Sequence, residues 1–397
     1  MTLNKSDTLI MAIATAFIVA NIYYCQPLIV LISKEFNISS AEAGRTSYLT
    51  QAGYAVGLLF LVPLGDMFER KKQIVFTTVL AVLSLIMAAT AQSFLVLEIA
   101  CFLIGFSSCV PQLILPLSAH LASPEQRGKV VGIIMSGLLV GILASRTLSG
   151  FIGEIYGWRT MFYIAAVICV AIIVLIQVRF PQSFPNFKGN YKKLMGSITS
   201  LIKQEPVLRE ASAVNFFVFM IFGSFWTNMV LLLANDPYSF KSDQIGLFGL
   251  VGAVGALTAP LVGKLSDKGN PRKAVGYGLV LLFIAQAIFY FFGTQLYFFI
   301  AGIIVLEMGQ QAVHVSNQTR VYALDAAARN RLNTVLMTMS FIGAALGSAI
   351  GLALWENKGW GAICIASAIM AILAFVIYLF TYKKNVSLAH KTLIRNQ

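Results

Sequence analysis

Residues 62–72 read VPLGDMFERKK, and residues 263–268 read GKLSDK. Each stretch ends a run of mostly apolar residues, about 20 long, and each carries an Asp close to basic residues. The two acidic residues, Asp66 and Asp267, lie 201 residues apart in a chain of 397. The sequence therefore predicts two equivalent loops in a chain built by duplication.

Further pairs of residues recur at nearly the same spacing. Arg127 corresponds to Arg329, and Trp158 corresponds to Trp360. A stripe of small residues also recurs, in which Gly141, Ser145 and Ser149 correspond to Gly343, Gly347 and Gly351. Matches at one offset predict a duplicated unit of six spans. Transporters built in this way hold their solute where the repeats meet.

The composition indicates a membrane protein. The chain is 58% hydrophobic and 11% charged, whereas soluble domains carry about 25% charged residues. Apolar windows long enough to cross a bilayer recur along the whole chain. We place them at residues 8–32, 45–64, 74–92, 94–121, 130–153, 159–180, 210–234, 244–264, 274–293, 295–322, 332–355 and 360–381.

We therefore predict an all-α membrane protein, with twelve transmembrane helices in two pseudo-symmetric six-helix bundles. Helices are expected because each one satisfies its own backbone hydrogen bonds in lipid. The predicted N-terminal bundle is residues 1–180, and the C-terminal bundle with its tail is residues 210–397. The polar segment 181–209 is the predicted linker. We expect it to be solvated, although its basic residues could instead contact anionic lipid.

The net charge of +13 is unevenly distributed. If the N-terminus is cytoplasmic, 23 of the 29 Lys and Arg residues lie on the inner side. The exceptions are Lys34, Arg45, Arg159, Lys241 and Lys358 on the outer side and Arg146 within a span. This asymmetry predicts a plasma (inner) membrane protein with both termini and the linker in the cytoplasm. It argues against nucleic acid as a partner.

Catalytic and metal-binding patterns are absent from the sequence. The five Cys residues fall in apolar stretches without paired spacing, which predicts neither a disulfide framework nor a zinc site. No phosphate-binding loop, zinc-protease motif or nucleophile elbow is found. The first apolar stretch is too long for a cleaved signal peptide. We expect no enzyme activity, cofactor or metal, and we expect a gradient rather than ATP to drive any transport.

The loop at 62–72 resembles the loop between spans two and three of the major facilitator superfamily. That loop typically reads Gly-x-x-x-Asp-Arg-x-Gly-Arg/Lys-Arg/Lys. Asp66 and the basic run are present, whereas Val62 and Met67 replace the first Gly and the first Arg. Residues 124–128, PEQRG, resemble the loop between spans four and five. The resemblance covers nearly the whole chain and implies the two-bundle fold of that superfamily.

The layout is most similar to the twelve-span drug–proton antiporter branch. Two positions depart from its pattern. Cys101 stands where the branch usually has an Arg in span four, and Arg146 stands where it usually has a Pro in span five. The resemblance implies export by antiport with protons.

The repeated loops predict a conformational latch between the two halves. An Asp near a helix end can pair with cations and cap backbone N–H groups of a neighbouring helix. The predicted latch residues are Asp66, Arg70, Lys71, Arg127, Asp267 and Lys268. The alternative is that these loops are simply basic and solvated.

Three ionisable residues lie inside predicted spans, where charge is costly. Arg146 lies deep in span five and is predicted to bind an anion or respond to protons. Glu307 and His314 lie on one polar stripe of span ten, because steps of three and four residues follow one helix face. Both are candidate proton-binding groups. Each of the three could instead be a structural pairing partner.

Polar residues of the other spans complete a predicted solute cavity. In the superfamily, spans one, four, seven and ten line the central cavity, which implies that these residues face it. The candidates are Asn21, Tyr24, Gln26, Gln112, Trp226, Asn228, Gln310, Gln311 and Asn317. Tyr23 is assigned either here or to the interfacial aromatic belt. Rings combined with amides suit an amphiphilic organic solute. Pro27, Pro111 and Pro116 are expected to loosen their helices.

The sequence thus predicts a monomeric secondary transporter that exports small organic compounds in exchange for protons by alternating access. Its expected partners are a small-molecule substrate, protons and membrane lipid. An uptake symporter or facilitator for a polar nutrient or metabolite is the alternative. A lipid translocator or a non-transporting membrane receptor is the third interpretation.

Overall fold

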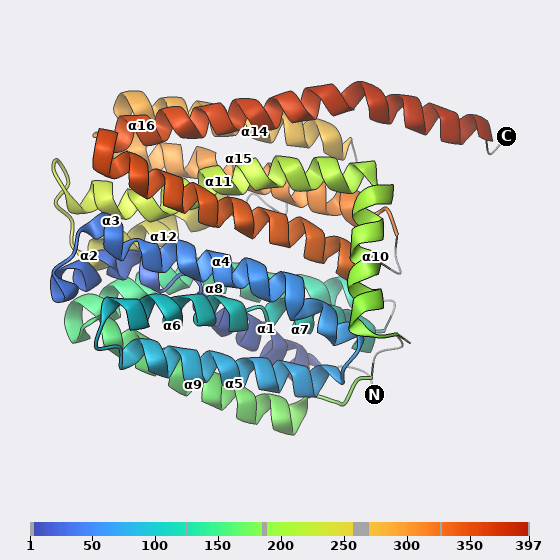
Figure 1. Cartoon of the computed structure of the whole chain (residues 1–397), viewed down its shortest axis with the longest axis horizontal. Helices are drawn as coiled ribbons and strands as arrows, with labels where there is room; N and C mark the ends of the chain where they lie inside the picture. Colours follow the sequence, from blue (N-terminus) through green and yellow to red (C-terminus); the bar gives the residue numbers. More distant parts are fainter. Residues whose placement is uncertain (1–3, 124–125, 185–188, 257–269, 326–327, 396–397) are drawn as a thin grey trace.

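The computed structural model describes residues 4–123, 126–184, 189–256, 270–325 and 328–395. The described residues form helices and no strand. Figure 1 shows two groups of helices, one from each half of the chain, with α10 (Tyr191–Gln204) crossing one end of the assembly. We call this the linker end, where the N-terminus also lies, and the other the far end. The prediction of an all-α membrane fold is confirmed.

The first group contains α1 (Lys5–Ala20), α2 (Cys25–Phe36), α3 (Ser40–Ala43), α4 (Arg45–Phe60), the 3-10 turn η1 (Val62–Asp66), α5 (Arg70–Ala89), α6 (Phe94–Ser107), α7 (Pro111–Leu121), α8 (Arg127–Tyr156) and α9 (Trp158–Arg179). The second contains α11 (Pro206–Ala234), α12 (Ser242–Ala256), α14 (Pro271–Phe292), α15 (Leu296–Tyr322) and α16 (Arg329–Arg395). Ten stretches of the described residues are long and apolar enough to cross a membrane. The predicted span at 244–264 begins as α12 and continues outside the described residues.

Two glycines turn the chain at equivalent places in the halves. Gly157, with φ of 84°, separates α8 from α9, and Gly359, with φ of 69°, divides α16. Positive φ is the region that glycine adopts without steric cost. Each glycine precedes the Trp of the repeat, Trp158 or Trp360. The predicted spans at 332–355 and 360–381 are therefore the two parts of α16.

The small-residue stripes bring helices together in the same way in both halves. A Cβ on Gly141 of α8 would overlap the backbone oxygen of Ala16 in α1, and one on Gly347 of α16 would overlap that of Met220 in α11. Span five therefore packs on span one as span eleven packs on span seven. Small residues allow this close approach because they remove the side chains that would separate the backbones.

Two predicted spans are broken rather than continuous. The span predicted at 8–32 is interrupted between α1 and α2, where the Tyr23 N–H bonds to the Ala20 carbonyl in a tighter turn. Pro27 has no N–H, and its ring clashes with the carbonyl four residues earlier, that of Tyr23. Pro111 stands in the same relation to Ser107, the last residue of α6, so the span predicted at 94–121 divides into α6 and α7.

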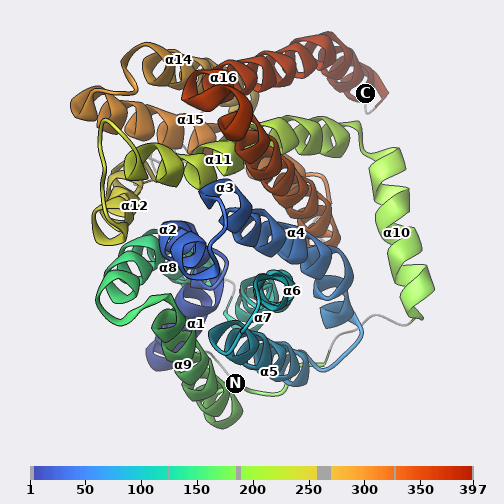
Figure 2. The same ribbon diagram turned by 60° about the vertical axis from the view of Figure 1, so that its left-hand side comes forward.

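The linker is partly helical, which the prediction of a solvated segment missed. Leu194 and Ile198 of α10 are buried, and Ile198 belongs to an apolar cluster with Leu208 of α11 and Leu332 of α16. Their spacing puts both side chains on one face of the helix. Figure 2 shows α10 at the edge of the molecule, reaching from the second half towards the first.

The halves touch at both ends. At the far end, the Ser39 hydroxyl donates to Glu356 Oε1 at 3.1 Å, and Lys241 pairs with Glu154 at 4.0 Å. Deeper contacts between the halves join Ser47 to Thr227 at 3.0 Å, Ser348 to Gln51 at 3.0 Å, and Thr147 to the Gly246 carbonyl at 2.9 Å. At the linker end, Asn330 donates to Asp66 at 3.2 Å and Asn333 to Gln112 at 2.9 Å.

Candidate functional site

A cavity of about 440 Å³ lies between the two halves. Its polar lining consists of Tyr23, Tyr54, Gln112, Ser136, Arg146, Glu307, Gln310, Gln311, His314 and Gln318. The rest of the lining is apolar and includes Phe219, Phe222 and Phe341. A second cavity of about 520 Å³ shares Gln112 and Gln318 with it and reaches Arg329 and Asn330 near the linker end. The central cavity therefore continues towards the linker end.

Arg146 lies on α8 and is only 2% exposed. Its Nε donates to Gln26 Oε1 at 2.8 Å. The guanidinium carbon lies 3.9 Å from the centre of the Trp226 ring and 4.8 Å from that of the Tyr23 ring. Both terminal nitrogens are buried and have no acceptor among the described residues. The cation is thus held by one amide and two rings, and four of its N–H donors remain available.

Glu307 lies on α15 and is 3% exposed. Its Oε1 accepts a hydrogen bond of 3.0 Å from Trp226 Nε1. Trp226 therefore contacts both charges, Arg146 through its ring face and Glu307 through its N–H. The described ion pairs include none between Glu307 and Arg146. Gly255 of α12 allows this helix to approach, since a Cβ there would overlap that of Glu307.

A hydrogen-bonded chain runs from His314 towards the linker end. Asn215 Nδ2 bonds to His314 Nδ1 at 3.1 Å, Asn317 Nδ2 donates to Asn215 Oδ1 at 2.9 Å, and Arg320 donates to Asn317 Oδ1 at 3.0 Å. Arginine can only donate, so its position fixes the orientation of both amides. His314 Nδ1 must then accept, which means that it carries no proton in this arrangement.

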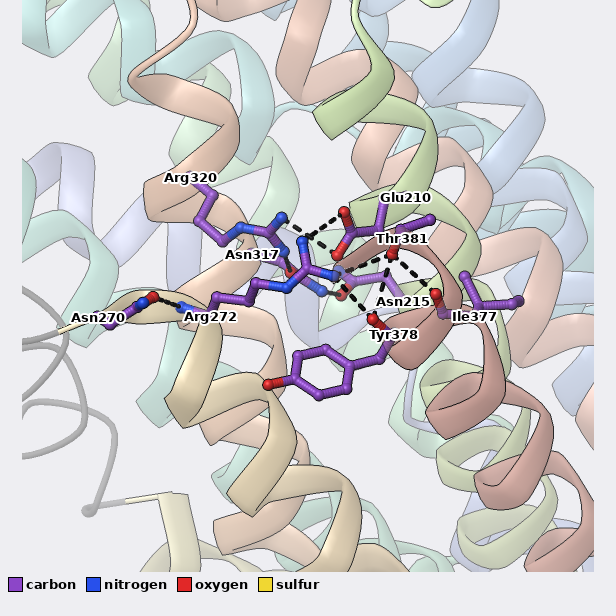
Figure 3. Close-up of polar contacts among 9 residues, drawn as sticks. All are labelled: Glu210, Asn215, Asn270, Arg272, Asn317, Arg320, Ile377, Tyr378 and Thr381. Carbon is purple, nitrogen blue, oxygen red and sulfur yellow. Dashed lines mark hydrogen bonds and ion pairs between the residues drawn. The ribbon is translucent and has the colours of Figure 1, made fainter. Parts of the chain in front are cut away.

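Arg320 connects this chain to the charged cluster drawn in Figure 3. Glu210 of α11 accepts from Arg272 of α14 at 3.0 Å and pairs with Arg320 of α15 at 3.2 Å. Arg272 also donates to the Tyr378 carbonyl at 2.7 Å and the Thr381 hydroxyl at 3.0 Å, both on α16. The Glu210 side chain is 1% exposed, and those of the two cations are 10% and 11% exposed. The cluster of Glu210, Arg272 and Arg320 thus connects four helices.

Arg272 and Arg320 enter the sequence analysis only as part of the count of inner-side cations, and no role is predicted for either. Both are paired and largely buried. Glu210 was not selected from the sequence at all. Its place at the very start of an apolar span was the available signal, because a buried carboxylate requires partners. Which cations supply them depends on how the helices assemble.

The predicted cavity residues divide into two groups. Gln112, Gln310 and Gln311 line the cavity, while Gln26 and Trp226 contact Arg146. The other amides form hydrogen bonds outside the cavity lining: Asn21 bonds to Cys169 Sγ, Asn228 to the Ser224 carbonyl and Asn317 to Asn215. Tyr24 lines an apolar pocket between α1 and α8. The prediction left Tyr23 open between cavity and interface, and the ring lies in the cavity lining. Tyr54 was missed, although Ser47, Gln51 and Tyr54 follow one face of their span at steps of four and three residues.

The predicted latch residues lie at the linker end. Asp66 accepts from Asn330 of the other half. Arg70 donates instead to the Gly65 carbonyl and the Ser183 hydroxyl, and Lys71 donates to the Gln177 carbonyl. Asp267, Lys268 and the side chain of Arg127 lie outside the described residues. Among the described latch residues, Asp66 makes the contact between halves.

Two bundles of apolar helices with a cavity between them are typical of a membrane transporter built from two repeats. A sequence profile described as the Major Facilitator Superfamily matches residues 11–319 and 211–393. The chain belongs to this superfamily. It is a multi-pass membrane transporter of small molecules and not an enzyme.

Known proteins resemble the chain over most of its length. It is 41% identical over 376 residues to the "Uncharacterized transporter YgaY" of Escherichia coli O157:H7, with 95% of each chain covered. It is 24% identical over 353 residues to a Helicobacter pylori protein named "Probable sugar efflux transporter", with 86% of each covered. The crystal structure of a bacterial homologue of the human lysosomal transporter Spinster, inward-facing and occupied, has a TM-score of 0.75 at 15% identity, covering 95% of this chain and 96% of that one. This last likeness concerns the fold.

Proposed function

We propose that the protein is a proton-coupled secondary transporter of small organic compounds that works by alternating access. The observation that carries this proposal is the buried group of Arg146, Trp226 and Glu307 in the cavity between the halves. Charges at membrane depth are expensive, and those that persist mark solute or ion pathways. A carboxylate in such a cavity can bind a proton from one side and release it to the other when the halves rock.

The distribution of Lys and Arg supports placing the linker end in the cytoplasm of a cell bounded by its inner (plasma) membrane. The contacts at the far end, including those of Ser39 and Lys241, would then close the outer side. The second cavity, which reaches Asn330, would open towards the cytoplasm. A solute from the cytoplasm could therefore reach Arg146 and Glu307 in this arrangement.

Export is the direction that we propose first. The sequence resembles the drug–proton antiporter branch, and the Helicobacter pylori relative carries efflux in its name. Uptake by symport is the second candidate, and a specific observation favours it. Arg146 offers unoccupied donors to an anion, and an anion is the kind of solute that binds together with a proton.

The test is the Glu307→Gln variant in proteoliposomes, with a solute selected by thermal-shift screening. Because the amide mimics the protonated acid, the variant should exchange solute across the membrane at a rate close to wild type. It should lose accumulation driven by an imposed pH gradient. Glu35→Gln makes the same substitution at a partly exposed carboxylate that does not line the cavity, and it serves as the control. If Glu307→Gln concentrates solute as well as wild type does, Glu307 is not the coupling group.

A further inference from the structure

We propose that Arg146 is the binding site for the carboxylate, or an equivalent singly charged oxyanion, of an amphiphilic organic anion that the protein transports. The proposal rests on the transport function above and specifies its substrate class. It starts from the two terminal nitrogens of Arg146, which are buried and have no acceptor among the described residues. Buried donors without acceptors are costly, so a ligand that supplies two oxygens would satisfy them.

The shape of the site fits a planar, two-pronged ligand. A guanidinium presents parallel N–H groups that match a carboxylate with two hydrogen bonds. Here the guanidinium plane is held by Gln26 at Nε and by the rings of Trp226 and Tyr23. These contacts fix its orientation before any ligand arrives, which lowers the entropic cost of binding.

The remaining lining fits an apolar body attached to that anionic group. Phe219, Phe222, Met337 and Phe341 line the same cavity as Arg146. Its volume of about 440 Å³ lies within the usual range for small-molecule sites. A sugar or a small inorganic anion would leave these apolar surfaces without a partner. An aromatic or branched aliphatic carboxylate covers them.

The charge balance of the cavity links this anion to a proton. The ionisable groups that face the cavity are Tyr23, Tyr54, Arg146, Glu307 and His314. His314 accepts at Nδ1 from Asn215 and is therefore uncharged in this arrangement. If Glu307 is ionised, its charge offsets that of Arg146 and repels a second anion. The organic anion therefore binds best when Glu307 carries a proton, so that anion and proton cross together, as in the symport candidate.

The experiment measures binding to purified protein in detergent by isothermal titration calorimetry. The ligands share one ring system: a naphthalene carboxylate, the corresponding sulfonate, the neutral carboxamide and a naphthylmethyl ammonium ion. Wild type should bind the carboxylate about tenfold or more tightly than the carboxamide, in line with the strength of charged hydrogen bonds. Arg146→Gln should remove this preference, and Arg146→Lys should retain part of it.

Arg159→Gln is the matched control. Arg159 also stacks on a tryptophan, Trp158, at 4.3 Å, but it does not line the cavity, so the variant should bind the carboxylate like wild type. Melting temperatures establish that each variant is folded, and Arg146→Lys keeps the test available if Arg146→Gln is not. Carboxylate binding should also weaken as pH rises in wild type and become independent of pH in Glu307→Gln.

Several outcomes would overturn the proposal: no carboxylate binding by wild type, equal affinity for the carboxamide, tighter binding of the ammonium ion, or an unchanged preference in folded Arg146→Gln. A preference for the sulfonate over the carboxylate would support an oxyanion site and correct its geometry. Failure here leaves the coupling assay with Glu307→Gln unaffected, because that assay uses whichever solute the screen provides. Conversely, anion binding through Arg146 can stand if the Glu307 assay fails.

Discussion

Trp226 contacts the two charges of the cavity by different parts of one side chain. Its ring face meets the Arg146 guanidinium at 3.9 Å, and its N–H donates to Glu307 at 3.0 Å. An indole is well suited to this position because its ring face attracts cations and its N–H can only donate. The two functions can therefore be separated by substitution.

Trp226→Phe should keep anion binding within about threefold of wild type, because a phenyl ring still presents a face to Arg146. Trp226→Leu should weaken anion binding about tenfold, because it removes the ring from a buried cation. Calorimetry with the naphthalene carboxylate measures both. Equal effects of the two substitutions would mean that the N–H, and not the ring face, organises the site.

At the scale of helices, the cluster of Glu210, Arg272 and Arg320 joins α11, α14, α15 and α16. Removing one partner of a buried ion pair costs about 3–5 kcal/mol. Glu210→Gln should therefore lower the free energy of unfolding by roughly that amount, seen as a large drop in melting temperature in detergent. Glu35→Gln is the matched control, because Glu35 pairs with Arg159 while 44% exposed, and exposed pairs contribute less than about 1 kcal/mol. Similar drops for both variants would contradict the structural importance of the cluster.

The close helix contacts allow a second test at this scale. Gly141→Ala and Gly347→Ala should each destabilise the fold by about 1–3 kcal/mol, because an added methyl group would overlap a backbone oxygen on the neighbouring helix. Gly132→Ala, on α8 as well, has no atom within 4 Å of the added carbon and should be tolerated. Unfolding in detergent compares the three variants, and a stable Gly347→Ala would argue against tight packing of α16 on α11.

Helix positions could be predicted because each membrane span satisfies its own backbone, so hydropathy alone locates it. Pro27 and Pro111 predicted weakened helices but not complete breaks, because a helix can respond to the missing hydrogen bond either by kinking or by ending. α10 was missed because a short amphipathic helix depends on the surface it packs against. The site was only partly predictable. The face of α15 that carries Glu307 follows from periodicity, but whether Asn21 or Tyr23 lines the cavity depends on how the first span turns at its break.

At the scale of the whole molecule, the two halves are joined by contacts at both ends. Asp66 and Asn330 form one such contact at the linker end. Asp66→Asn should slow transport several-fold while leaving solute affinity nearly unchanged, because the pair lies away from the residues that line the central cavity. The readouts are the initial rate of uptake into proteoliposomes and the dissociation constant in detergent.

The exchanged pair is the control for this prediction. Asn330→Asp alone places two carboxylates opposite each other and should also disturb the rate, whereas Asp66→Asn combined with Asn330→Asp restores a carboxylate–amide contact and should recover it. A mutant that loses affinity at an unchanged rate would remove Asp66 from the latch. The division of the chain into residues 1–180, 181–209 and 210–397 stays a prediction.

The hydrogen bonds that link Arg320 to His314 all run in one direction, from Arg320 through Asn317 and Asn215 to His314. Each amide accepts through its oxygen and donates through its nitrogen to the next residue. Arg320, which begins the series, cannot reverse its role because a guanidinium has no acceptor. If His314 Nδ1 were protonated, its N–H would face the N–H of Asn215, and the hydrogen bond between them would be lost. Rotating the Asn215 amide would restore that bond but would place its N–H against the N–H of Asn317. Rotating Asn317 as well would place two donors against each other at Arg320. Protonation of His314 would therefore cost the hydrogen bond between Arg320 and Asn317, at the edge of the Glu210 cluster and about two turns of helix away.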